Sequence, residues 1–299
     1  MRFVRLVCYL PLLAVLLQAA PAVAQHAIEI QRKTAKGDYF EALTLYERMP
    51  KRTVTSAARV AAGKAAWALS LPARAVEEFD AVLRGSDITP SDRAKLLLSR
   101  GIIEYQEGRY QTAILFAEKL SALLDSPSTY RAKAWLLWAE SLSKLNSYGA
   151  AEQKYEKALA ESAEEDRAEI RYLLGVCELK LGDTVKSRAQ FEQIPFENER
   201  APQAIRALAQ ISLDEGRVNE AGFWLRKGRS EFPEEFLDAW VDYALIQVAI
   251  KENNREDVSV IQAEAAKKYP PSDYWLTLLN AAAEAYNWTA TMEMAHANF

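Results

Sequence analysis

Apolar residues recur at helical spacing through most of the chain, and short polar turns interrupt them at regular intervals. One such stretch reads KGDYFEALTLYERMP, from Lys36 to Pro50, with a turn Gly, two aromatic positions, a small Ala and a closing Pro. The same order of residue types returns in EGRYQTAILFAEKL from Glu107, LNSYGAAEQKYEKAL from Leu145 and LGDTVKSRAQFEQIP from Leu181. The pattern predicts a chain built from repeated helical units.

The turn residues define the period of the repeat. The longer intervals contain connections with Pro, Arg84–Arg93 and Leu123–Arg131, after which the pattern resumes in register. We therefore interpret these connections as longer turns between units and not as domain boundaries. The turn residues stand 33 to 38 residues apart, at Gly37, Ser70, Gly108, Asn146, Gly182, Gly216 and Asn253.

Small residues occupy two positions of most units, where crossing helices need close approach of their backbones. Seven residues before the turn stand Gly63, Gly101, Ala139, Gly175 and Ala209. After the turn stand Ala42, Ala75, Ala113, Ala151, Ser187 and Ala221. Four residues further on, apolar side chains follow at Tyr46, Phe79, Ala117, Tyr155, Phe191 and Leu225.

Over Gln25 to Pro270 this pattern resembles the tetratricopeptide repeat, a helix–turn–helix unit of about 34 residues, in a secreted or periplasmic bacterial form. The resemblance implies an all-α fold, a right-handed α-solenoid of about seven helix hairpins over residues 25–270. Residues 271–299 are expected to form a C-terminal capping helix and tail, with the helix over Tyr274–Tyr286. An unrelated helical bundle or another helical-repeat family stays open as an alternative.

The first residues have the pattern of a secretory signal. Arg2 and Arg5 precede an apolar run from Leu6 to Leu17, and Ala22 and Ala24 are small residues of the kind a signal peptidase requires. The run is shorter than the roughly 20 residues that cross a bilayer. We expect residues 1–24 to be a signal peptide, cleavage after Ala24 and a periplasmic location. An uncleaved anchor is the alternative.

Composition and motifs argue against several classes of protein. With 299 residues, 50% apolar, 26% charged and a net charge of −4, the chain is typical of an ordinary soluble protein and not of a nucleic-acid binder. The two histidines, His26 and His296, lie near the ends, and no phosphate loop or metal motif occurs. The acids Glu164–Asp166 are interpreted as a helix start and Cys177 as a buried apolar side chain. We expect no enzyme activity, no cofactor and no metal. An unrecognised carboxylate site is the weakest alternative.

The family resemblance implies that partners bind the inner face of the first helix of each pair. Acids at these positions are Glu140, Glu169 and Asp214. The aromatic residues Trp67, Tyr105, Tyr172 and Tyr243 also fall there, with packing as an equal alternative, whereas Trp135 is expected to pack. The charges can equally form an ordinary solvated face. Basic residues outnumber the acids at the same positions: Lys64, Lys95, Lys133, Lys144, Lys180, Arg206 and Lys251.

These features together predict a non-catalytic scaffold that holds a partner of an envelope, secretion or surface-appendage assembly in its concave groove. The expected partner is a protein or peptide, with an acidic segment or an anionic polysaccharide suited to the basic groove. A carbohydrate-binding element of a polysaccharide export or cell-wall machine is the alternative function. No nucleic-acid partner and no membrane span after cleavage are expected.

Overall fold

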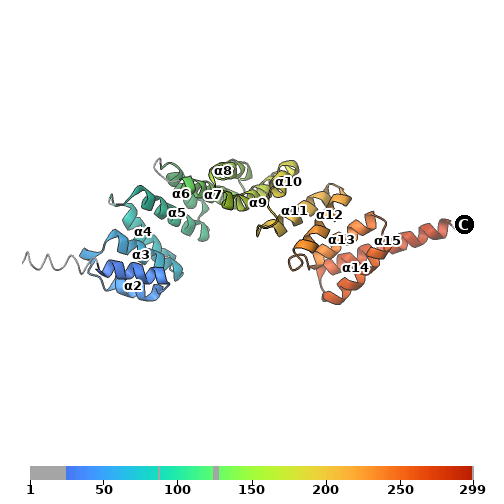
Figure 1. Ribbon diagram of the computed structural model, residues 1–299, viewed down its shortest axis with the longest axis horizontal. Helices are drawn as coiled ribbons and strands as arrows, with labels where there is room; N and C mark the ends of the chain where they lie inside the picture. The colour runs from blue at the N-terminus through green and yellow to red at the C-terminus, as the bar shows by residue number, and fades with distance from the viewer. Residues whose placement is uncertain (1–24, 87, 124–127, 298–299) are drawn as a thin grey trace, which may run out of the picture. The chain divides into compact units, whose positions relative to one another are not determined.

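The computed structural model describes residues 25–86, 88–123 and 128–297, and throughout them the chain is helical with no β-strand (Figure 1). The predicted all-α class is therefore confirmed, and the stacked helix pairs are those of an α-solenoid. The predicted signal peptide and its cleavage site lie outside the described residues. The helices group into two compact units, one ending at Ser162 and one beginning at Ala163.

Within its described residues, the first unit contains four helix pairs. The two helices of a pair pack against each other, and each pair packs against the next one. A short 3₁₀ turn, Lys51–Thr53, connects the first two pairs. The pairs are residues 25–36 with α2 (Tyr39–Glu47), α3 (Ser56–Ala68) with α4 (Pro72–Leu83), α5 (Pro90–Gln106) with α6 (Tyr110–Ser121), and α7 (Ser128–Lys144) with α8 (Tyr148–Glu161).

Over its described residues, 163–297, the second unit contains three helix pairs and a final long helix. Leu276, Leu279 and Ala283 of this final helix, α15, are buried against α13 and α14. It begins at the predicted Tyr274 and continues past the predicted end to Ala297. The pairs are α9 (Glu164–Leu181) with α10 (Thr184–Glu192), α11 (Ala201–Asp214) with α12 (Val218–Glu231), and α13 (Ala239–Lys251) with α14 (Arg255–Lys268), followed by α15 (Tyr274–Ala297).

All seven predicted turn residues have a left-handed backbone. In the described parts of the chain they are also the complete set of positions with positive φ, four of them glycines and the others Ser70, Asn146 and Asn253. Glycine and asparagine adopt this conformation at low cost and end helices without a steric clash. The turn chemistry in the sequence therefore predicted the break inside every pair.

The small positions lie where the helices cross. A Cβ atom on Gly175 would stand 2.7 Å from the ring of Phe191, and one on Gly63 would clash with the ring of Phe79. Each ring belongs to the second helix of the same pair and is almost fully buried. In the third pair Ala117 replaces the ring, and Leu137 of α7 fills the space beside Gly101 instead.

Local signals set several helix starts. Thr55 and Thr89 accept hydrogen bonds from backbone N–H groups in the first turns of α3 and α5, as N-cap residues do. The acids Glu164–Asp166 occupy the first turn of α9, where the helix dipole favours them, so their interpretation as a helix start is confirmed. Cys177 is buried in α9, as its apolar surroundings in the sequence predicted.

Candidate partner-binding grooves

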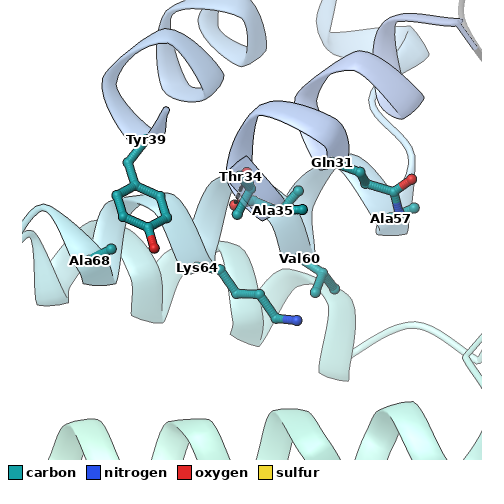
Figure 2. A pocket seen from close by; sticks show the side chains of 9 residues that line it. Gln31, Thr34, Ala35, Tyr39, Ala57, Val60, Lys64 and Ala68 are labelled. Carbon is teal, nitrogen blue, oxygen red and sulfur yellow. Dashed lines mark hydrogen bonds between the residues drawn. The ribbon is translucent and has the colours of Figure 1, made fainter. Parts of the chain in front are cut away.

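A hollow lies between the helix over residues 25–36 and α3 (Figure 2). Its volume is about 400 Å³. The side chain of Lys64 extends along it from α3, and the ring of Tyr39 stands at one end. The hollow is lined by Gln31, Thr34, Ala35, Tyr39, Ala57, Val60, Ala61, Lys64 and Ala68.

This hollow continues toward α5. A second hollow shares Gln31, Ala57, Val60 and Lys64 with the first, so the two form one surface across three successive first helices. We call this surface the N-terminal groove. The second hollow is completed by Ser56, Ile88, Thr89, Asp92, Lys95, Leu96 and Ser99.

Small side chains keep the N-terminal groove open. Ala35, Ala57 and Ala68 are exposed on its surface. The hydroxyl of Thr34 donates to the carbonyl oxygens of Ile30, at 2.9 Å, and Ala61, at 3.3 Å. The latter bond ties the first helix to α3, so the spacing of the two walls is held by a direct contact.

Lys64 gives this groove its charge. It is exposed, and no acid among the described residues forms an ion pair with it. Lys95 lies 3.3 Å from Asp92, with both side chains about half exposed, so this pair contributes little stability. A hydrogen bond from Thr89, with a smaller contribution from a hydrogen bond from Lys95, holds the pKa of Asp92 below its usual value. The charge of Lys64 acts in the same direction. The groove therefore presents cations available to an anionic group.

A separate hollow in the second unit is more apolar. We call it the C-terminal groove; its volume is about 650 Å³. The hydroxyl of Tyr286 donates to the side-chain oxygen of Asn253 at 2.6 Å and so positions one wall. Its lining combines the ends of α11 and α13 with one face of α15: Leu213, Asp214, Gly216, Val218, Gln247, Ile250, Lys251, Ala282, Ala285, Tyr286 and Thr289.

Two segments match models of known repeats, residues 60–125 and residues 142–211, and both models describe the tetratricopeptide repeat. The chain contains tetratricopeptide repeats. The family resemblance drawn from its turns and small residues is thus confirmed. No curated protein matches the chain.

Solved structures of repeat proteins share the fold. A tetratricopeptide repeat protein from Parabacteroides merdae is 16% identical over 78% of this chain and 87% of its own, with a TM-score of 0.55. YrrB, described as a TPR protein with an unusual peptide-binding site, is 19% identical over 70% and 99%, with a TM-score of 0.55. PilF of Pseudomonas aeruginosa is 14% identical over 73% and 96%, with a TM-score of 0.54. At these identities the likeness concerns the fold alone.

The repeats bring some of the predicted groove cations into the hollows and leave others outside them. Lys64 and Lys95 line the N-terminal groove, and Lys251 and Asp214 line the C-terminal groove. The remaining lysines lie elsewhere on first helices, exposed and without an ion pair to any described residue: Lys133 and Lys144 on α7 and Lys180 on α9.

Arg206 is engaged within its own unit. Its guanidinium donates to Asp238 and to the carbonyl oxygen of Glu235, and it lies 4.9 Å from the ring of Phe236 and 5.2 Å from that of Trp240. These partners hold the residue in place. Arg206 is therefore a structural cation of the second unit.

The predicted aromatic residues are all half-buried against neighbours, and none belongs to the lining of the hollows described above. The indole N–H of Trp67 donates to Gln106 at 3.1 Å. Tyr105 packs edge-on against Tyr110, and burial, with a smaller effect of the charge of Glu140, raises its pKa to about 12. In the second unit, Tyr172 contacts Phe191 and Arg200, and Tyr243 contacts Trp275.

Sequence reasoning missed part of both grooves. It considered groove positions only from the second repeat onward, although Gln31 and Thr34 stand at the same distances before Gly37 as Lys64 and Trp67 before Ser70. The spacing therefore contained the signal for the first repeat. Tyr286 and Thr289 of α15 lie outside the repeat pattern, so no spacing rule identified them.

Metal sites and membrane spans are absent from the residues that the structure describes. Within 25–86, 88–123 and 128–297, no group of three or more His, Cys, Asp or Glu side chains is arranged to hold a metal ion. Over the same ranges, no helix combines the length and apolar character needed to cross a bilayer.

Proposed function

We propose that this protein is a non-catalytic scaffold that holds an acidic segment of a partner protein in the N-terminal groove. The observation that carries the proposal is Lys64, an exposed cation without an ion pair in the stretch that the two hollows share. An ammonium in such a position gains a charge-assisted hydrogen bond when a carboxylate arrives. It loses no partner of its own.

The shape of the groove suits an extended peptide. It crosses three first helices, and its alanines leave room for the side chains of a bound segment. Gln31 and the hydroxyl of Tyr39 supply polar groups along it for a peptide backbone. The peptide-binding site of YrrB, a structural neighbour, supports this choice of ligand by analogy.

We place the scaffold in the periplasm, as part of an envelope, secretion or surface-appendage assembly, because its first 24 residues have the pattern of a secretory signal. N-terminal sequencing of the exported protein tests this location. The expected first residue is Gln25. A membrane-bound chain that still begins with Met1 would contradict the cleavage and indicate an anchor.

The carbohydrate alternative has less support. Sugar rings bind on open aromatic faces, whereas Trp67, Tyr105, Tyr172 and Tyr243 are half-buried and packed against neighbouring side chains. An acidic polysaccharide would need only the cations, so the binding experiment includes an anionic oligosaccharide as a competitor.

A capture experiment tests the scaffold function. The exported protein and its K64E/K95E variant are immobilised and exposed to envelope extract, with K51E/R84E as a control that reverses two exposed cations elsewhere in the first unit. We expect the control to retain a specific partner and K64E/K95E to lose it. Added salt should weaken the wild-type interaction, because screening shortens the range of exposed charges. Equal retention by both variants would reject the groove as the binding site.

A further inference from the structure

The hairpin of α7 and α8 brings together a cluster of aromatic and basic side chains, none of which is a predicted groove residue. Trp135 and Trp138 stack with ring centroids 5.6 Å apart and planes 20° from parallel. The ammonium of Lys154 lies 3.9 Å from the Trp138 ring and 5.0 Å from the Trp135 ring. That of Lys157 lies 4.8 Å from the Trp135 ring. We call these four residues the lysine–tryptophan patch.

The patch has positive charge without a paired acid. Neither lysine forms an ion pair with a described residue. The nearby carboxylate of Glu161 is already occupied, because Arg131 donates to it at 2.8 Å and the indole N–H of Trp135 donates at 3.1 Å. Neither ammonium group is therefore held in an ion pair, although Glu118 acts on Lys154 and Glu161 on Lys157 through their charges.

The two cations also disfavour each other. Burial lowers the pKa of Lys154, the charge of Lys157 lowers it further, and Glu118 of α6 opposes both effects. Contact with a tryptophan face stabilises an ammonium by about 0.5–1 kcal/mol at exposed sites. An anion bound between the two lysines would relieve their repulsion and leave the contacts with the rings intact.

We propose that the lysine–tryptophan patch is a second docking surface, which binds carboxylates of an acidic segment in a partner protein. Each ammonium has a ring on one side, and Lys157 is exposed on the other. The lysines cover the tryptophan faces, so a stacked sugar would first have to displace them, whereas a carboxylate binds without displacement. This surface is distinct from the N-terminal groove and does not depend on the function proposed for it.

The test uses a fluorescein-labelled octaglutamate peptide and fluorescence anisotropy. The parent protein in this test is K64Q/K95Q, and every variant carries the same two changes. Binding in the N-terminal groove is thereby removed equally from each. We expect K154Q/K157Q to bind the peptide about tenfold more weakly, a difference of about 1.4 kcal/mol. The K154R/K157R variant should bind within about twofold of its parent, since arginine keeps both the charge and the ring contact. The control K51Q/R84Q should bind like its parent.

Cross-linking of the unmodified protein gives an answer that does not depend on how the variants fold. A carbodiimide joins a peptide carboxylate to an amine in direct contact, and mass spectrometry locates the product. Cross-links at Lys154 or Lys157, above the level seen with a glutamine octapeptide, support the proposal. Cross-links confined to Lys64 and Lys95 would overturn it and leave the groove proposal standing. Equal peptide affinity of K154Q/K157Q and its parent would also overturn it, as would equal losses in the glutamine and arginine variants.

Discussion

The two grooves occupy related positions of the same repeat and differ in chemistry. The N-terminal groove has a surface of small residues around Lys64, whereas the C-terminal groove is lined mainly by apolar side chains and by Tyr286. Counted from the turn residue, Lys64 of α3 corresponds to Gln247 of α13, and Ala57 corresponds to Trp240. Trp240 is half-buried beneath Arg206. A tryptophan therefore occupies in the second unit a position that alanine leaves open in the first.

This comparison shows that the repeat determines where a hollow can form and single side chains decide whether it does. The C-terminal groove lies toward the ends of α11 and α13, where α15 supplies a wall that is not part of any repeat. The chemistry available to a ligand thus differs between two surfaces made from one repeated unit. The repeat scaffold alone does not predict the ligand of either groove.

The largest effect is expected inside α5, one of the helices that contribute to the N-terminal groove. Glu104 of α5 is buried and accepts hydrogen bonds from Arg100, at 2.6 Å, and from Arg109. Its counterpart in α13 is the apolar Ala249. Breaking a buried ion pair costs about 3–5 kcal/mol, so Glu104→Gln should destabilise the first unit by roughly that amount at neutral pH. Thermal unfolding measures the loss, and Ala249→Ser serves as a milder change at the matching position. A variant as stable as the wild type would show that the ion pair is dispensable.

The same pair makes a pH prediction. Burial opposes ionisation of Glu104, but Arg109 and Arg100 together hold its pKa below the usual value. A depressed folded-state pKa contributes stability above the unfolded-state value, near 4.5, and that contribution is lost as the pH falls. Hydrogen exchange should therefore show α5 loosening on acidification below that value. The loss of hydrogen-exchange protection on acidification should be smaller in Glu104→Gln, which lacks the titrating carboxylate. Identical acid sensitivity in the two proteins would contradict this assignment.

Overpacking the helix crossings should have the next largest effect. Gly63→Leu in the first unit and Gly175→Leu in the second each push a side chain into a buried phenylalanine ring. We expect each to cost about 1–3 kcal/mol. Because repeats contact mainly their neighbours, hydrogen exchange should rise around the changed pair first. Uniform loosening of all the helices would argue against independent repeat contacts.

Filling the grooves tests their difference in function. Ala57→Trp places in the first unit the residue that α13 has at the same repeat position, so it should block the N-terminal groove and reduce capture of the acidic partner about tenfold, or about 1.4 kcal/mol. Ala285→Trp fills the C-terminal groove and should leave capture unchanged. Both alanines are exposed, so folding should be preserved. Reduced capture by Ala285→Trp, with capture by Ala57→Trp unchanged, would assign the partner to the C-terminal groove.

The smallest effect concerns the turns. Ser70 has φ of 58° and Asn253 has φ of 56°, a conformation that costs most non-glycine residues about 1–2 kcal/mol. Ser70→Gly should therefore stabilise the first unit, by about 0.5 kcal/mol after the entropy of glycine is counted. Asn253→Gly should bring no gain, since asparagine tolerates this conformation and its side chain accepts the bond from Tyr286. Chemical denaturation measures the free energy of unfolding of each variant. Equal gains in stability for Ser70→Gly and Asn253→Gly would show that the hydrogen bond from Tyr286 to Asn253 is unimportant.

Part of the site could be predicted because it depends on local spacing. Lys64, Lys95 and Lys251 line hollows, as their positions relative to the turns suggested. Arg206 stands at an equivalent kind of position, but it pairs with Asp238, which is 32 residues away in the sequence. No periodic rule identifies such a partner. The cations that stay available could therefore be separated from the structural one only in the folded chain.

The sequence by itself determined the helices, the seven turns and the close crossings, because each depends on residues a few positions apart: a left-handed turn residue, a glycine or alanine, and apolar side chains at helical spacing. Tertiary structure alone decided which surfaces are open and which charges are compensated. It brought Lys154 of α8 over the rings of Trp135 and Trp138 of α7, and it added α15 to the C-terminal groove. These arrangements join side chains from different helices, so their energies depend on contacts that no local pattern contains.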